Sequence, residues 1–70
     1  MAEKLVGTLR CVTEHMFATY ESVVHYISVG SIILVVARHR QYRAKHIAIF
    51  FEGKVYTTTV AMVRNRSEVV

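Results

Sequence analysis

The 70-residue sequence has a single cysteine and contains no proline, no tryptophan and no aspartate. A disulfide within the chain is therefore impossible, and the lone thiol of Cys11 fits a reducing compartment or a small packed side chain. A chain this short forms at most one domain, predicted here over residues 1–70, and buries only about 60% of its unfolded surface. Small scaffolds usually gain stability from disulfides, a metal or a partner, and 53% of these residues are hydrophobic. We therefore expect a homodimer or a bound partner.

The patterns that carry catalysis and metal binding are also missing. The five glutamates are scattered along the chain, and no spacing indicates a Ser-His-acid triad, a Cys-His pair or a glycine-rich phosphate loop. Cys11 with His15, and His39 with His46, do not match a closed zinc pattern of four ligands. We predict that the protein is not an enzyme and needs no cofactor or metal.

Positive charge is concentrated in one part of the sequence. Nine Lys and Arg residues face five Glu, which gives a net charge of +4. Most of the excess lies in residues 38–45, called the basic segment below. Such a segment attracts phosphate backbones, anionic lipids or acidic proteins, or it is a solvated loop that keeps the protein soluble. The residues predicted to contact nucleic acid are Arg38, Arg40, Tyr42, Arg43, Lys45, Arg64 and Arg66.

Several segments have the alternation of β-strands. Residues 4–13 fit a half-buried strand, with Leu9 and Cys11 on the apolar face and Arg10 on the polar one. Residues 31–37 follow Gly30 and are apolar on both faces, as in a central strand. Residues 47–51 and 55–60 alternate around Glu52-Gly53, which predicts a tight hairpin in which Gly53 takes positive φ. The tail, residues 64–70, is predicted as a polar turn followed by a short closing strand.

Residues 16–27 allow two interpretations. The spacing of Met16, Phe17, Tyr20, Val23 and Ile27 fits an amphipathic helix, which would cover about residues 14–28 and pack on a four-stranded antiparallel sheet. The many β-branched and aromatic residues are poor helix formers and fit a long, folded-over strand pair instead. The sequence leaves both open: a mainly β fold, or an α+β fold.

The order of these elements resembles the SH3-like small β-barrel of five short strands. The matching features are a long first connection ending in Gly30, the apolar run after it, the Glu52-Gly53 hairpin, and the closing residues 67–70. The resemblance implies a compact scaffold of the kind found in small phage-encoded accessory proteins, which bind nucleic acid or another protein. The aromatic pair of peptide-binding SH3 grooves is missing, because the chain lacks tryptophan.

A membrane-spanning segment is the third structural hypothesis. Residues 23–37 are largely apolar and precede the basic segment, as at the end of a span. A span of about 17–25 residues would have to include Glu21 and His25, at a high cost in the bilayer. The first residues do not resemble a signal peptide. We therefore expect a cytoplasmic protein.

Two functions follow from these features. The first is a nucleic-acid-binding accessory module, in which Arg38, Arg40, Arg43 and Lys45 contact phosphates and Tyr42 stacks on a base. The alternative is a modulator of a host protein, steered by the basic segment toward an acidic partner. Its contacts would be an exposed sheet edge and the side chains of Met16, Phe17 and Tyr20.

Overall fold

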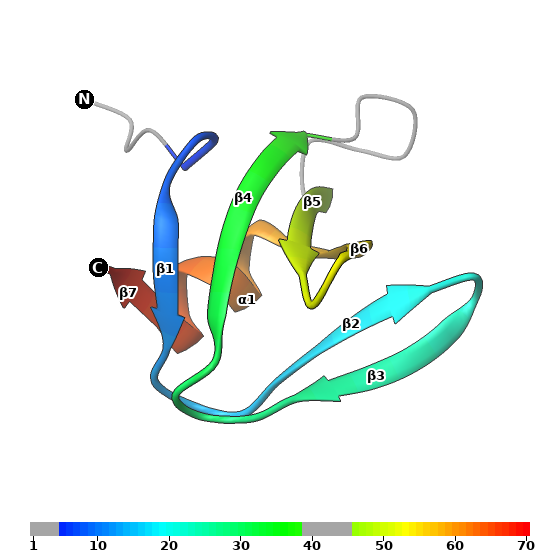
Figure 1. The fold of residues 1–70 in the computed structure, drawn as a ribbon, viewed down its shortest axis with the longest axis horizontal. Coiled ribbons are helices and arrows are strands. Elements are labelled where there is room, and N and C mark those ends of the chain that lie inside the picture. Colours follow the sequence, from blue (N-terminus) through cyan, green and yellow to red (C-terminus); the bar gives the residue numbers. More distant parts are fainter. Residues whose placement is uncertain (1–4, 39–45) are drawn as a thin grey trace.

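The computed structural model describes residues 5–38 and 46–70. These residues form seven strands, which lie in a single antiparallel sheet, and one short helix (Figure 1). The elements are β1 (Leu9–Val12), β2 (Met16–Tyr20), β3 (Val23–Ile27), β4 (Ile32–Arg38), β5 (His46–Phe51), β6 (Lys54–Thr59), α1 (Val60–Arg66) and β7 (Ser67–Val69). The strands are ordered β3-β2-β6-β5-β4-β1-β7 across the sheet. The predicted mainly β fold is confirmed.

The first four strands form one long ribbon that is bent in the middle. Leu9 pairs with Leu34 in one half of the ribbon, and Met16 pairs with Ile27 in the other half. The bend lies at Gly30, which has φ +93° and donates its N–H to the carbonyl of Val12 at 2.8 Å. A positive φ is easily reached by glycine and strained in other residues. The folded-over strand pair is therefore the correct interpretation of residues 16–27.

The alternative prediction, a helix over about residues 14–28, is wrong, because this part of the chain forms strands β2 and β3. A two-residue turn, Glu21-Ser22, joins β2 to β3, and both turn residues have positive φ (50° and 65°). Two positive φ values indicate a type I′ turn, whose twist matches that of paired strands. Valine, tyrosine and isoleucine lose side-chain freedom in a helix but pack well on a pleated sheet.

Strands β4, β5 and β6 form a meander. The turn between β5 and β6 is Glu52-Gly53, with φ of 49° and 79°, and Phe51 pairs with Lys54 across it. This confirms the predicted hairpin and the positive φ of Gly53. The register of β4 against β5 shifts between Val35 and Ala37, which indicates a β-bulge next to the start of the basic segment.

Helix α1 occupies residues that the alternation assigned to a strand end and a polar turn. The side chain of Thr59 caps the helix by accepting the N–H of Met62 at 3.1 Å. Val63 points into the core and is fully buried. The helix ends at Ser67, where β7 begins and pairs with β1, so the predicted closing strand is confirmed.

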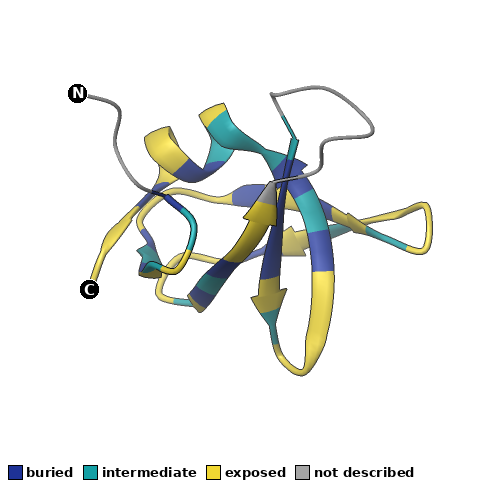
Figure 2. Cartoon of the chain, turned by 90° about the horizontal axis from the view of Figure 1, so that it is seen from above, coloured by how far each residue is buried: buried dark blue, intermediate teal, exposed yellow. Residues whose placement is uncertain are grey.

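The core lies between the curved sheet and α1 (Figure 2). Its buried members come from the segment before β1, from strands β1 to β6 and from the helix: Leu5, Val12, Met16, Ala18, Ile27, Ile33, Val35, Ile47, Ile49, Tyr56 and Val63. Arg10 shares this inner side of β1 with Val12 and is only 3% exposed, whereas Leu9 is 48% exposed. The predicted inner and outer faces of the first strand are therefore wrong. The strand starts only at Leu9, after a turn, so the alternation of side chains expected from residue 4 onward does not continue into it.

The sheet is not closed into a barrel, so this part of the SH3-like prediction is wrong. In the described residues β3 and β7 are the outer strands, and the count is seven rather than five. Closure would require the outer strands to pair, but β3 belongs to a hairpin that extends away from β7 (Figure 1). The fold is a small antiparallel β domain with one short helix in its described part. Within residues 5–38 and 46–70, no helix has the length and apolar character needed to cross a membrane.

Candidate interaction surface

The side of the sheet opposite the core carries a row of apolar side chains. Leu9 pairs with Leu34, Leu34 pairs with Phe50, and Phe50 pairs with Val55, so one residue from each of four adjacent strands lies side by side. Directly paired residues point to the same face of a sheet. Ile32 lies on the same face of β4 as Leu34, because side chains alternate along a strand. These five residues are called the outer face below.

The outer face is open to solvent. Leu9, Ile32, Phe50 and Val55 are 42–52% exposed, and Leu34 is half-buried between its neighbours. Single exposed apolar residues are ordinary on protein surfaces, whereas contiguous apolar patches mark sites of interaction. The adjoining inner residues Ile33, Val35 and Ile49 are completely buried. Strands β4 and β5 are therefore apolar on both faces, while the described core occupies one of them.

The basic segment begins where β4 ends. Arg38 is the last residue of β4, and Arg40, Tyr42, Arg43 and Lys45 lie outside the described residues. On the other side of the segment, His46 opens β5 and pairs with Thr59. The segment thus connects the two strands that carry Leu34 and Phe50.

Arg64 and Arg66 lie in the last turn of α1. Arg66 donates from Nη1 to the carbonyl of His15 at 2.9 Å, and Arg64 is exposed. The helix begins after Thr59, the partner of His46, and a seven-residue helix is about 10 Å long. The two arginines are therefore at the far end of α1 from the strand ends that hold the basic segment.

The three residues predicted for a protein contact lie in different environments. Met16 is completely buried in the core and is not available at the surface, which corrects its predicted role. Phe17 is 47% exposed, and its ring meets that of Tyr26 edge-on at 5.4 Å. Tyr20 is half-buried: its ring lies 5.5 Å from that of Tyr56, with the Lys54 ammonium 5.2 Å above it. Of the three, Phe17 is the most accessible.

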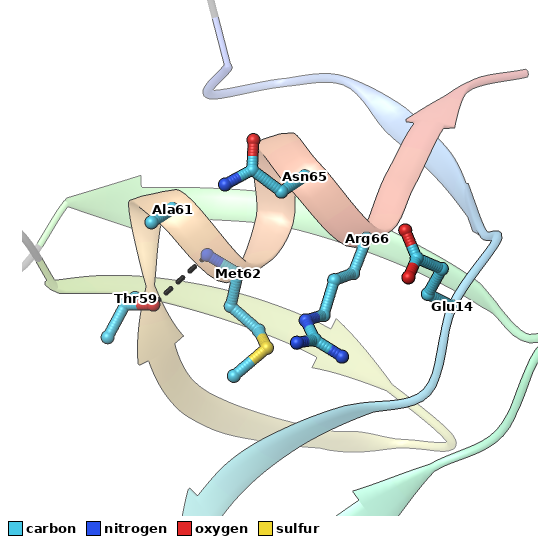
Figure 3. A pocket seen from close by; sticks show the side chains of 6 residues that line it. All are labelled: Glu14, Thr59, Ala61, Met62, Asn65 and Arg66. Carbon is cyan, nitrogen blue, oxygen red and sulfur yellow. Dashed lines mark hydrogen bonds between the residues drawn. The ribbon is translucent and has the colours of Figure 1, made fainter.

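The hollows of the described surface are shallow. One of them, of about 310 Å³, lies between the turn before β2 and α1 (Figure 3). Its lining residues are Glu14, Thr59, Ala61, Met62, Asn65 and Arg66. This lining has one carboxylate, that of Glu14, and one hydroxyl, that of Thr59, which accepts the N–H of Met62 as the cap of α1. In the described part of the chain, no three His, Cys, Asp or Glu side chains gather as metal ligands.

Alternation in the sequence contains a signal for the outer face that strand-by-strand analysis missed. The tight turn at Glu52-Gly53 fixes Phe50 opposite Val55 once the hairpin is accepted. Two apolar residues on the face opposite Ile49 predict that this hairpin is apolar on both faces. The pairing of β4 with β1 extends the row to Leu34 and Leu9, and this requires the tertiary structure.

Comparison with known proteins does not assign the chain to a family. No protein-family model matches it, and neither a curated protein nor a solved structure is significantly similar to it.

Proposed function

We propose that the protein is a non-enzymatic binding module that docks through its outer face on an acidic protein. The observation that carries this proposal is the exposed apolar row Leu9–Leu34–Phe50–Val55 across four paired strands. Burying such a row contributes about 25 cal/mol for each Å² of apolar surface removed from water. The rigid sheet behind it holds the side chains in place, which reduces the entropy lost on binding.

The acidic character of the partner follows from the positive charge of the chain. The strand that carries Ile32 and Leu34 continues directly into the basic segment, and the whole chain has a net charge of +4. A positively charged module with an exposed apolar face complements a partner surface with an apolar centre and acidic surroundings. Opposite charges of this kind increase the association rate and suppress wrong partners. The lone cysteine fits a reducing compartment such as the cytoplasm.

The test begins with capture of the partner from nuclease-treated lysate of the source cells. The captured protein is identified by mass spectrometry, purified, and titrated against wild type and variants by calorimetry. Phe50→Asp is expected to weaken binding about tenfold or more, because it places a charge in the centre of the contact. Val29→Asp is the matched control, since Val29 is 50% exposed but lies in the turn before β4, outside the outer face. It should change affinity less than about twofold.

Two results would overturn the docking proposal. One is a purified partner whose affinity is the same for Phe50→Asp and for wild type. The other is a partner surface that is basic rather than acidic. Loss of all captured protein after nuclease treatment would favour nucleic acid as the ligand instead.

Nucleic-acid binding by the basic segment is the second candidate function, supported by the run of Arg38, Arg40, Arg43 and Lys45 around Tyr42. Four phosphate contacts predict a slope of about −3.6 for log affinity against log salt on duplex DNA. Affinity for a labelled duplex should then fall about 150-fold between 50 and 200 mM salt. Fluorescence anisotropy measures this.

Arg40→Glu with Arg43→Glu should abolish that binding, while Phe50→Asp should leave it unchanged. A salt-independent affinity, or full binding by the charge-reversed protein, would contradict the nucleic-acid hypothesis. The two variants therefore separate this function from docking on a protein.

A further inference from the structure

Strand β3 is an outer strand of the described sheet and has none of the usual protection of a sheet edge. Its residues, Val23–Ile27, include no proline and no charged side chain, and it pairs with β2 without a bulge over five residues. The other outer strand, β7, has three residues, of which one is Glu68. Natural proteins shorten or charge their edge strands to prevent pairing with other chains. β7 follows this rule, and β3 does not.

The turn before β3 determines which backbone groups face outward. In a two-residue hairpin the residues flanking the turn, here Tyr20 and Val23, exchange backbone hydrogen bonds, and such pairs alternate along the strands. Val23, His25 and Ile27 therefore bond to β2. Val24 and Tyr26 point their N–H and C=O groups away from β2, toward the open edge.

The side chains on the same two residues are apolar and accessible. Val24 is 63% exposed and Tyr26 is 51% exposed. Tyr26 pairs with Phe17, which is 47% exposed, so the hairpin has an apolar strip beside its open edge. The hairpin extends away from the rest of the sheet, which leaves room for a further strand (Figures 1 and 2).

We propose that β3 pairs antiparallel with β3 of a second copy of this chain. The register that uses every outward group places Val24 opposite Tyr26 of the second copy, and Tyr26 opposite its Val24. His25 then lies opposite His25 of the second copy, on the two-fold axis. This arrangement forms four N–H···O=C bonds. If the second strand is shifted by one residue in either direction, the outward-pointing groups of one copy lie opposite inward-pointing groups of the other, and these bonds are lost.

A second copy fits this edge because the strand is complementary to itself. The two-fold pair brings Tyr26 of one copy beside Val24 of the other, which extends the apolar strip that starts at Phe17 into the partner hairpin. The chain carries a net charge of +4, so most approaches of two copies bring like charges together. β3 itself has no Lys, Arg or Glu side chain, so the copies can meet here. Two paired five-residue strands bury less area than a standard interface, so we expect a weak dimer in the micromolar range.

Proline at residue 24 tests the pairing. Val24→Pro removes an outward N–H and should leave the β2–β3 hairpin intact, because proline is tolerated on the solvent side of an edge strand. In sedimentation equilibrium, wild type should approach twice the monomer mass as its concentration rises, and Val24→Pro should stay a monomer. Val24→Thr keeps the N–H and a branched side chain and should dimerise like wild type.

A disulfide scan tests the register and does not depend on the proline variant folding. In a Cys11→Ser background, His25→Cys places two cysteines in a pair whose Cα atoms are about 4.5 Å apart, within disulfide range. Mild oxidation should convert this variant to a covalent dimer. Val23→Cys is the control, because in this register Val23 lies opposite Ile27 of the second copy. The two residues 23 are therefore separated by four residues along the strand, or about 13 Å, which is too far for a disulfide.

Three results would overturn the inference: a monomer at millimolar concentration, a dimer of Val24→Pro as stable as that of wild type, or equal cross-linking of Val23→Cys and His25→Cys. A dimer that is lost in Phe50→Asp and kept in Val24→Pro would also overturn it, because the copies would then meet through the outer face. Docking on an acidic partner is measured separately, so either proposal can fail without the other.

Discussion

Replacing Arg10 with alanine is expected to lower the free energy of unfolding by about 3–5 kcal/mol, because it removes a buried guanidinium together with its hydrogen bonds to Ser67. Arg10 is 3% exposed and donates from Nε to Ser67 Oγ at 2.9 Å and from Nη2 to the Ser67 carbonyl at 3.1 Å. Ser67 Oγ in turn donates to the carbonyl of Val63. The guanidinium thus joins β1 to the junction between α1 and β7, 57 residues away in sequence.

A loss of this size is large for so short a chain. Domains have about 0.05–0.15 kcal/mol of stability per residue, or about 3.5–10 kcal/mol for this length. Urea unfolding followed by circular dichroism measures the change. Ser67→Ala should cost about 1.5–3 kcal/mol, and a double-mutant cycle with Arg10→Ala isolates the coupling between the two side chains.

Arg64→Ala is the matched control for the loss of an arginine, since Arg64 is exposed on the last turn of α1. We expect it to change stability by less than about 1 kcal/mol. A change below about 1 kcal/mol for Arg10→Ala as well would contradict a structural role for the buried guanidinium.

The second large effect is a difference in stability between alanine substitutions at two neighbouring residues of β2, Met16 and Phe17. Met16→Ala should cost about 2–5 kcal/mol, because Met16 is completely buried and its removal leaves a cavity. Phe17→Ala should cost about 1 kcal/mol, because Phe17 is 47% exposed and loses mainly its ring contact with Tyr26. Both losses of stability are measured by urea unfolding, from the shift of the midpoint at an unchanged slope of free energy against urea concentration.

Equal losses for the two variants would mean that β2 does not present alternate faces to core and solvent as described. The comparison also bears on binding, because Met16 and Phe17 were both predicted as partner contacts. A binding defect of Met16→Ala would come from a lower folded fraction, whereas Phe17→Ala should stay folded.

Local rules predicted the turns at Gly30 and at Glu52-Gly53 correctly. Glu52-Gly53 and Gly30 needed only the steric freedom of glycine at positive φ, which is a property of one residue. The turn at Glu21-Ser22 has no glycine, so nothing local identified it, and residues 16–27 remained open between helix and hairpin. Pairing of β2 with both β3 and β6 decides that question.

The sequence by itself determined the β5–β6 hairpin, the apolar central strand and the short closing strand. Tertiary structure alone decided that Arg10 lies inside, that residues 60–66 form a helix, and that Leu9, Leu34, Phe50 and Val55 line up on an open face. The reason is physical: alternation and turn preference act between near neighbours along the chain. Which face of a strand becomes buried, and which strands lie side by side, depends on contacts between residues far apart in sequence.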